Sequence, residues 1–121
     1  MKTDFNIVKR QVIGEYLKLY GGDRKGQQWS MLDCLNVFRY YYALYKLTFG
    51  EDHPKLSNKT IQRIIADFPC TNDIYEYEFE PKDYPAMIKA YFNTGFEGCD
   101  YSIAHFMSGN IRTMRFYEEL Y

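Results

Sequence analysis

The sequence has little of what small extracellular or metal-binding proteins use to hold a fold together. It contains three cysteines, an odd number, and two histidines among 121 residues. An odd number of cysteines does not suit a disulfide framework, and their spacing matches no zinc motif. We therefore expect reduced thiols, a cytoplasmic location and no bound metal, with the cysteines as buried structural side chains.

Long apolar runs and catalytic motifs are missing as well. No stretch approaches the roughly 20 apolar residues of a membrane-spanning helix, and residues 1–5 carry no signal-peptide pattern. There is no glycine-rich phosphate loop and no nucleophile elbow, and Cys99 and His105 lie six apart, which matches no zinc pattern. We expect no membrane association, no cofactor and no enzymatic activity. An enzyme would need a pocket that gathers His105, Cys99 or acids from separate helices.

Alanine is scarce, with five residues, whereas aromatic residues make up 19% of the chain and include 13 tyrosines. A helical protein of this composition fills its core with rings, and some of those rings reach the surface. Exposed tyrosines are favoured in protein-binding surfaces because a rigid ring gives contact area at a low entropy cost. The composition therefore favours a protein that works through contacts with other proteins.

Capping residues and apolar periodicity predict a mainly α, compact single-domain bundle of about five helices over residues 1–121. The second helix has apolar residues on nearly all sides, so we expect it to be the buried centre of the bundle. Its Tyr40–Tyr41–Tyr42 run points three ways, which should bring at least one ring to the surface. The predicted helices run from Asp4 to Gly21, from Ser30 to about Thr48 before Gly50, from Ser57 to Phe68, from Asp83 to Gly95, and, in two pieces, from Ser102 to Tyr121.

Residues 74–80 break the helical pattern, because apolar or aromatic residues alternate there with glutamates. This alternation predicts a short extended segment with its rings on one face and the acidic row Glu76, Glu78 and Glu80 on the other. Alternate strand residues lie about 6.8 Å apart, close to the spacing of phosphates along a nucleic acid, so the row can imitate phosphates in a basic groove. Asp73 and Asp83 would extend it. An ordinary edge strand also carries such charges to deter aggregation. The strand needs a partner, either nearby around Phe96 or in another molecule.

These features predict a small non-enzymatic binding or regulatory protein. Its protein partner, of unknown identity, would contact Tyr75, Glu76, Tyr77, Glu78 and Glu80. A homodimer is compatible with the same surface. Small size without catalytic motifs also fits an accessory or inhibitory protein of a phage or mobile element.

A basic face supports an alternative function. Residues 1–70 hold eleven basic against seven acidic residues, and residues 71–121 hold four against nine. The 57–68 helix resembles the second helix of a helix-turn-helix, which would bind DNA. The connection before it is longer than that motif uses, and a pI near 6.1 is unfavourable for a nucleic-acid protein. A solvated helix face explains the same charges. The candidate DNA contacts are Lys55, Asn58, Lys59, Gln62 and Arg63.

Overall fold

The computed structural model describes residues 1–21, 28–69, 71–72, 77–95 and 98–108. Within these ranges the chain is mainly helical, which confirms the predicted fold class. The helices are α1 (Phe5–Tyr20), α2 (Met31–Phe49), α3 (Asn58–Asp67), α4 (Tyr84–Phe92) and α5 (Ile103–Phe106). The remaining elements are β1 (Lys2–Thr3), β2 (His53–Pro54), β3 (Thr71–Asn72), β4 (Tyr77–Glu78) and the 3-10 helix η1 (Pro81–Asp83).

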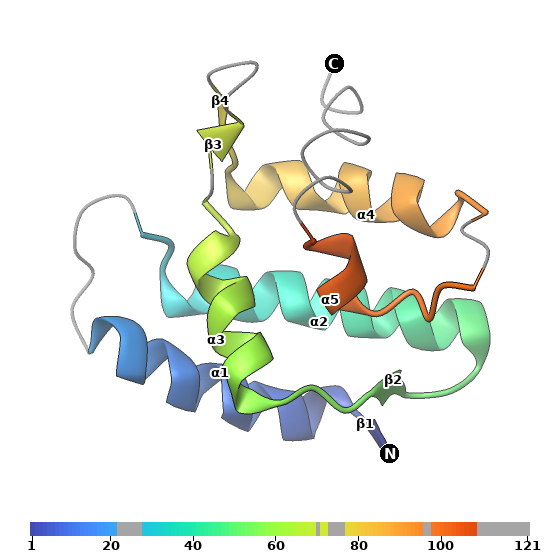
Figure 1. Ribbon diagram of the computed structural model, residues 1–121, viewed down its shortest axis with the longest axis horizontal. Coiled ribbons are helices and arrows are strands. Elements are labelled where there is room, and N and C mark those ends of the chain that lie inside the picture. Colours follow the sequence, from blue (N-terminus) through green and yellow to red (C-terminus); the bar gives the residue numbers. More distant parts are fainter. Residues whose placement is uncertain (22–27, 70, 73–76, 96–97, 109–121) are drawn as a thin grey trace.

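Helix α2 lies between α1 and α4, and α3 crosses α1 (Figure 1). The short α5 contacts both α2 and α4 through the ring of Phe106. The centre of that ring lies 5.9 Å from the ring of Tyr41 on α2 and 5.3 Å from the ring of Tyr91 on α4. The helices therefore share one core, with α2 at its centre as expected.

Helix starts follow the local sequence. The side chains of Asp4, Ser30 and Ser57 each accept a hydrogen bond from the backbone N–H three residues later. These bonds satisfy donors that a helix leaves unpaired at its N-terminus, as the predicted N-caps require. Gly50 ends α2 with a φ of 71°, a backbone region that favours glycine. Ser102 caps α5, but this helix ends at Phe106, and residues 109–121 of the predicted last helix lie outside the described ranges.

The prediction that α2 is buried on nearly all sides is wrong along one face of the helix. Leu32 and Leu47 have exposed fractions of 62% and 82%. Asn36, Arg39 and Ala43 between them are exposed as well. These positions recur every three or four residues, so one stripe of α2 faces solvent along the helix. In the tyrosine run Tyr41 and Tyr42 are buried and Tyr40 is partly exposed, as predicted.

The two sheets are short antiparallel pairs. Strand β4 pairs with β3, so the predicted extended segment finds its partner just before it in the chain rather than around Phe96. Residues 73–76 and 96 lie outside the described ranges. The second pair joins β1 to β2, with Lys2 opposite Pro54 and Thr3 opposite His53.

The His53 side chain is buried at the point where α2, β2 and α5 meet, with 1% of its surface exposed. Its Nε2 accepts a hydrogen bond of 2.9 Å from the backbone N–H of Ile103, so Nδ1 carries the proton and donates to the Pro54 carbonyl at 2.7 Å. The ring stacks on Tyr42, with ring centres 4.3 Å apart. Burial lowers the pKa of His53 to about 4, which keeps the ring neutral.

This lowered pKa predicts a fold that weakens in mild acid. Above pH 6.5, His53 is neutral in both the folded and the unfolded chain, and its contribution to stability is complete. As the pH falls below 6.5, the unfolded chain takes up the proton first. The free energy of unfolding should then drop by about 2 kcal/mol by pH 5. Urea unfolding at pH 7 and pH 5 measures this drop.

The His53→Gln variant supplies the control, because it removes the titration of His53. The other histidine, His105, is present in the wild-type protein and in the variant, so its effect is the same in both. Its stability should be lower than that of the wild-type protein at pH 7 but should change much less between pH 7 and pH 5. An equal drop in the two proteins would assign the acid sensitivity to other groups.

Candidate functional site

The described part of the predicted partner-binding segment is anchored to the core by one ring. Phe79 is buried, whereas Glu78 is half-buried and Glu80 is exposed, so the predicted alternation holds at these three positions. The indole Nε1 of Trp29 donates a hydrogen bond of 3.3 Å to the Phe79 carbonyl. Tyr75 and Glu76 lie outside the described ranges, and only the strand position of Tyr77 is described. We call β3, β4, Phe79 and Glu80 the acidic hairpin.

Trp29 is itself held by two further aromatic residues. Its ring stacks on Phe68 with 4.8 Å between ring centres, and it meets the ring of Tyr84 edge-on at 5.1 Å. The Tyr84 hydroxyl donates a 2.6 Å hydrogen bond to the Phe68 carbonyl. These contacts join the end of α3, the start of α4 and the acidic hairpin, so a rigid cluster of rings supports the hairpin.

Asp83 does not belong to the acidic surface, which corrects the prediction that it extends the row. It is 7% exposed, and its Oδ2 accepts a hydrogen bond of 2.8 Å from the backbone N–H of Glu80. The sequence predicts that Asp83 caps α4, but its side chain makes no cap hydrogen bond there. Pro81 starts a helical turn before α4, so Asp83 already has helical backbone angles. Glu80 forms a 3.2 Å ion pair with Lys82, and both side chains are mostly exposed.

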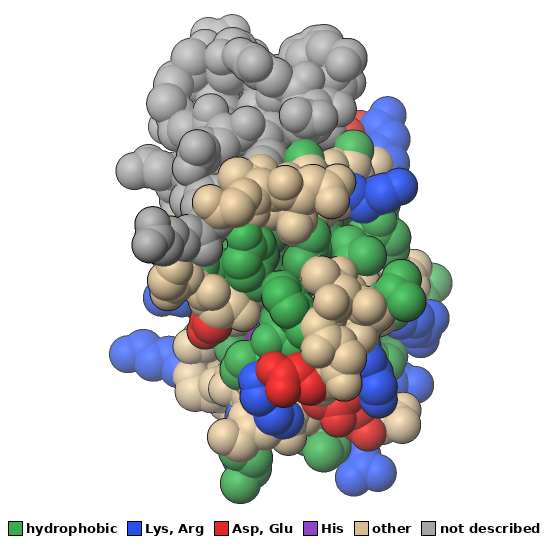
Figure 2. Space-filling view, turned by 90° about the vertical axis from the view of Figure 1, so that its right-hand side faces the viewer, with side chains coloured by type: hydrophobic (Ala, Val, Ile, Leu, Met, Phe, Trp, Pro, Cys, Tyr) green, Lys and Arg blue, Asp and Glu red, His purple; other side chains and the backbone are tan. Residues whose placement is uncertain are grey.

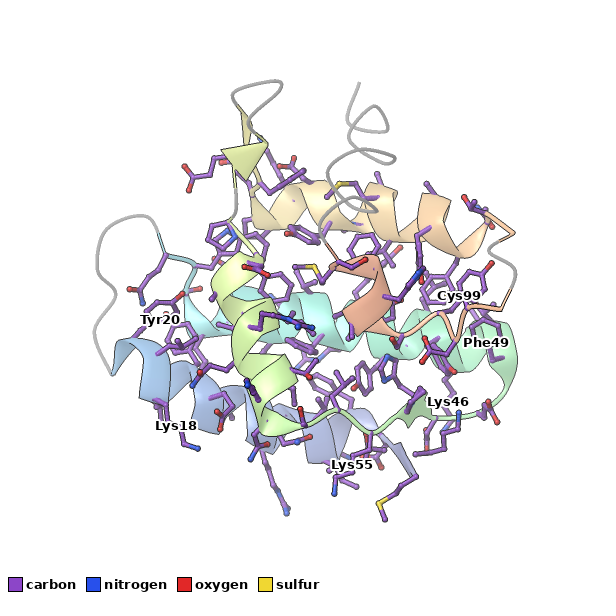
Figure 3. All side chains as sticks on the ribbon, viewed as in Figure 1. Lys18, Tyr20, Lys46, Phe49, Lys55 and Cys99 are labelled. Carbon is purple, nitrogen blue, oxygen red and sulfur yellow. The ribbon has the colours of Figure 1, made fainter. Side chains whose placement is uncertain are left out.

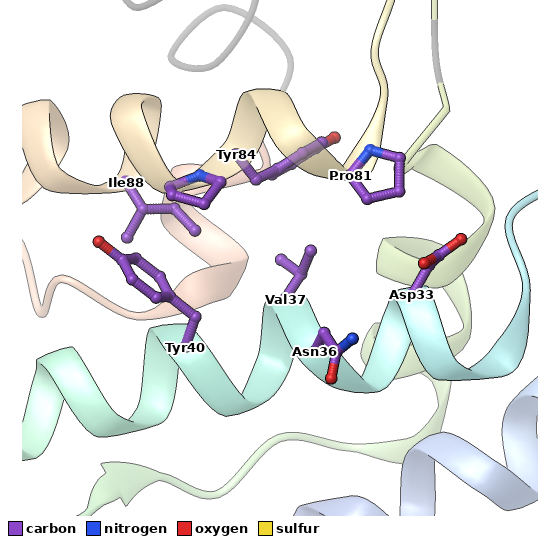
Figure 4. Close-up of a pocket in the computed structure, with 8 residues that line it drawn as sticks. Asp33, Asn36, Val37, Tyr40, Pro81, Tyr84 and Ile88 are labelled. Carbon is purple, nitrogen blue, oxygen red and sulfur yellow. The ribbon is translucent and has the colours of Figure 1, made fainter.

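A groove lies beside the acidic hairpin, between α2 and the η1–α4 segment (Figure 4). Its volume is about 250 Å³. Apolar side chains and two prolines form most of its walls, and polar groups from α2 stand at its edge. The lining residues are Asp33, Asn36, Val37, Tyr40, Pro81, Tyr84, Pro85 and Ile88. Such a groove suits one apolar side chain of a partner, with carboxylate and amide groups at the rim.

The candidate DNA contacts lie along α3, which packs against α1. Lys55, Lys59 and Arg63 are exposed. The two amide side chains among these candidates are hydrogen-bonded to α1. Asn58 Oδ1 accepts a 2.9 Å hydrogen bond from Gln11, and Gln62 lies 3.4 Å from Glu15. Figure 3 shows Lys55 on the side of the molecule formed by α1 and α3.

A cysteine, a histidine and a tyrosine meet at the other end of α4. Cys99 Sγ lies 3.1 Å from His105 Nδ1, and the Tyr91 hydroxyl lies 2.6 Å from that nitrogen and 3.2 Å from the sulfur. The sulfur also accepts a hydrogen bond of 3.1 Å from the backbone N–H of Tyr101. The sequence names Cys99 and His105 as residues that a catalytic pocket would have to gather, although their spacing matches no zinc motif, and it gives no signal that Tyr91 joins them.

The loop that presents Cys99 has an unusual backbone. Gly98 and Tyr101, on its two sides, have φ angles of 73° and 55°, and Tyr101 is the single non-glycine residue with positive φ in the described ranges. Residues other than glycine rarely adopt a positive φ, because it brings their side chain too close to the backbone. Tyr101 is fixed from two directions, because its carbonyl accepts a 2.6 Å hydrogen bond from Tyr41 and its own hydroxyl donates to the carbonyl of Thr94. The tight loop lets Cys99 fold back onto His105 in α5.

No family model, curated protein or solved structure matches this chain. Within the described ranges, no three His, Cys, Asp or Glu side chains are grouped as metal ligands would be. None of the helices in those ranges combines the length and apolar character needed to cross a membrane.

The assignment of Asp83 as a structural residue predicts a difference in stability between two neighbouring positions. Asp83→Ala leaves the backbone N–H of Glu80 without its carboxylate acceptor, so it should lower the free energy of unfolding by about 1–2 kcal/mol. Lys82→Ala removes only an exposed ion pair and should change stability by less than about 0.5 kcal/mol. Urea unfolding of both variants tests this, and equal effects would contradict the assignment.

Proposed function

We propose that this protein is a small, non-enzymatic binding protein that contacts a partner protein through the acidic hairpin and the adjacent groove. The observation that carries the proposal is their arrangement. A carboxylate-bearing strand pair, anchored by Phe79, stands directly before the Pro81 edge of a groove lined mainly by apolar side chains. Interfaces commonly combine a central apolar anchor with a charged rim, and this surface offers both.

The charges specify the chemistry of the partner. Glu78 and Glu80 lie on the hairpin and Asp33 lies at the groove edge, and Lys82 pairs with Glu80 only at the exposed surface. Exposed ion pairs of this kind contribute little, so a cationic partner can replace Lys82 at little cost. The best fit is a basic segment with one apolar or aromatic side chain for the groove.

The backbone of the hairpin favours an extended form of that segment. Strands β3 and β4 pair with each other, and neither pairs with a third strand in the described ranges. An exposed strand edge can accept a strand from another molecule, with main-chain hydrogen bonds giving affinity and alternate side chains giving specificity. An accessory or inhibitory role in a phage or mobile element stays a prediction from the sequence.

The DNA-binding alternative has less support from the geometry. The exposed cations of α3 would suit phosphate contacts, but the amides of Asn58 and Gln62 make their contacts with α1. A helix-turn-helix also needs its second helix to pack on the preceding one, whereas α3 packs mainly against α1. We therefore treat DNA binding as the competing outcome of the same experiment.

The proposal predicts binding of a basic extended peptide. A fluorescent peptide of alternating lysine and valine with one central tyrosine should bind the wild-type protein, more weakly as salt is added. The Glu78→Lys/Glu80→Lys variant should bind at least about tenfold more weakly, since two attractive charges become repulsive. Fluorescence anisotropy measures both, with labelled duplex DNA titrated in parallel.

A charge-matched variant provides the control. Glu51→Lys/Asp52→Lys makes the same change in net charge at the end of α2, where these acids pair with Lys2 and Lys46. It should retain peptide binding, and circular dichroism should show both variants folded. Equal loss in the two variants would indicate a general charge effect. Salt-sensitive DNA binding that is lost in Lys59→Ala/Arg63→Ala would instead favour the alternative function.

A further inference from the structure

The side chains of Cys99, His105 and Tyr91 form a compact cluster of hydrogen-bonding groups. Three polar atoms lie within 3.2 Å of one another, and the backbone N–H of Tyr101 points at the sulfur as well. With all side chains neutral, the Tyr91 hydroxyl can donate to Nδ1 of His105 and the thiol to the tyrosine oxygen. Moving the thiol proton to Nδ1 gives a second arrangement, in which three donors surround a thiolate.

In that second arrangement each donor of the cluster has the sulfur as its acceptor. The donors to the thiolate are the Tyr91 hydroxyl, the protonated Nδ1 of His105 and the Tyr101 N–H, and hydrogen bonds to a charged sulfur are stronger than those to a neutral one. Burial, followed by the hydrogen bond with Cys99, raises the pKa of Tyr91, so this hydroxyl keeps its proton at neutral pH. The cluster is thus a nucleophile beside a base, with a third group that holds its proton.

We propose that Cys99 is a site of oxidation by hydroperoxides, with His105 as its acid–base partner. The Cys99 thiolate attacks one oxygen of the hydroperoxide, the S–O bond forms and the O–O bond breaks. The displaced hydroxide or alkoxide takes the proton that His105 received from the thiol, so the products are the sulfenic acid of Cys99, neutral His105 and water or an alcohol. The sulfur is oxidised by two electrons and the peroxide is reduced by two.

The surroundings of the sulfur suit a small electrophile. Cys99 is half-buried, and it lies at the end of the molecule near Phe49 (Figure 3). Phe49 is 43% exposed and packs against Phe92 and Tyr101. Figure 2 shows hydrophobic side chains gathered on this end face. The leaving oxygen of a hydroperoxide needs a single proton, which the imidazolium supplies.

A second cysteine of the same protein serves as an internal reference. Cys34 is fully buried in α2, and burial raises the pKa of its thiol to about 12. It should therefore stay reduced under conditions that oxidise Cys99. Comparing both thiols within one folded molecule removes differences in concentration and handling.

The experiment treats the folded wild-type protein with hydrogen peroxide at pH 7 and traps sulfenic acid with dimedone. Peptide mass spectrometry then gives a rate for each cysteine. Cys99 should be labelled at least about tenfold faster than free glutathione, since general acid–base help of this kind commonly exceeds that factor, and Cys34 should remain unlabelled. A Cys99 rate equal to or below that of glutathione would overturn the proposal and leave the cluster a structural hydrogen-bond network.

Two variants test the role of His105. His105→Gln removes the proton carrier and should slow oxidation of Cys99 by at least about tenfold. Oxidation of Cys99 should also be slow in His105→Ala, and free imidazole should restore its rate. A histidine with a purely structural role would not give this recovery. Tyr20→Phe, which removes a tyrosine hydroxyl at the end of α1, outside both the groove and the Cys99 cluster, should keep the wild-type rate. A wild-type rate in His105→Gln, or no recovery in a folded His105→Ala protein, would overturn the role of His105.

Discussion

The two hydrogen bonds of the His53 ring are the contact on which the arrangement of the other elements depends. One nitrogen donates to the β2 backbone and the other accepts from the first residue of α5, while the ring stacks on α2. β2 also pairs with β1, which leads directly into α1. A single neutral imidazole thus connects segments from both ends of the described chain. This works only while the ring is uncharged, since a second ring proton would face the Ile103 N–H.

Around this point the core is built from rings instead of small residues. Phe106 of α5 contacts Tyr41 of α2 and Tyr91 of α4, and Trp29 stacks on Phe68 next to Tyr84. Aromatic pairs prefer particular edge-on and offset geometries, so they fix orientation as well as filling volume. Rings also span wide gaps between helices, which explains how short helices such as α4 and α5 complete one core. The scarcity of alanine is a direct consequence, because closely packed backbones are not what holds the helices together.

Features set by local chemistry could be predicted from the sequence, and features set by contacts distant in sequence could not. Asp4, Ser30 and Ser57 cap helices because each needs only a donor three residues away. The alternation of Glu78, Phe79 and Glu80 likewise needs only an extended backbone. Asp83 follows the same capping pattern, but the prediction from it is wrong. The helical turn that starts at Pro81 places the Asp83 carboxylate on the backbone N–H of Glu80 and not on α4.

The cluster at Cys99 shows why a motif search misses such a site. A cysteine and a histidine six positions apart match no common ligand spacing, and they meet here across a loop in which Gly98 and Tyr101 adopt positive φ angles. The strain at Tyr101 is offset by its hydrogen bonds with Thr94 and with Tyr41, which is 60 residues away in the sequence. The third member of the cluster, Tyr91, lies near the end of α4. The first residue of the same helix, Tyr84, belongs to the ring cluster that supports the acidic hairpin. Tyr84 and Tyr91 are seven residues apart, about 10 Å along a helix, and each is anchored by its own hydrogen bonds. The two surfaces therefore share a rigid element but not their contacts, so a change at one site leaves the anchoring of the other intact.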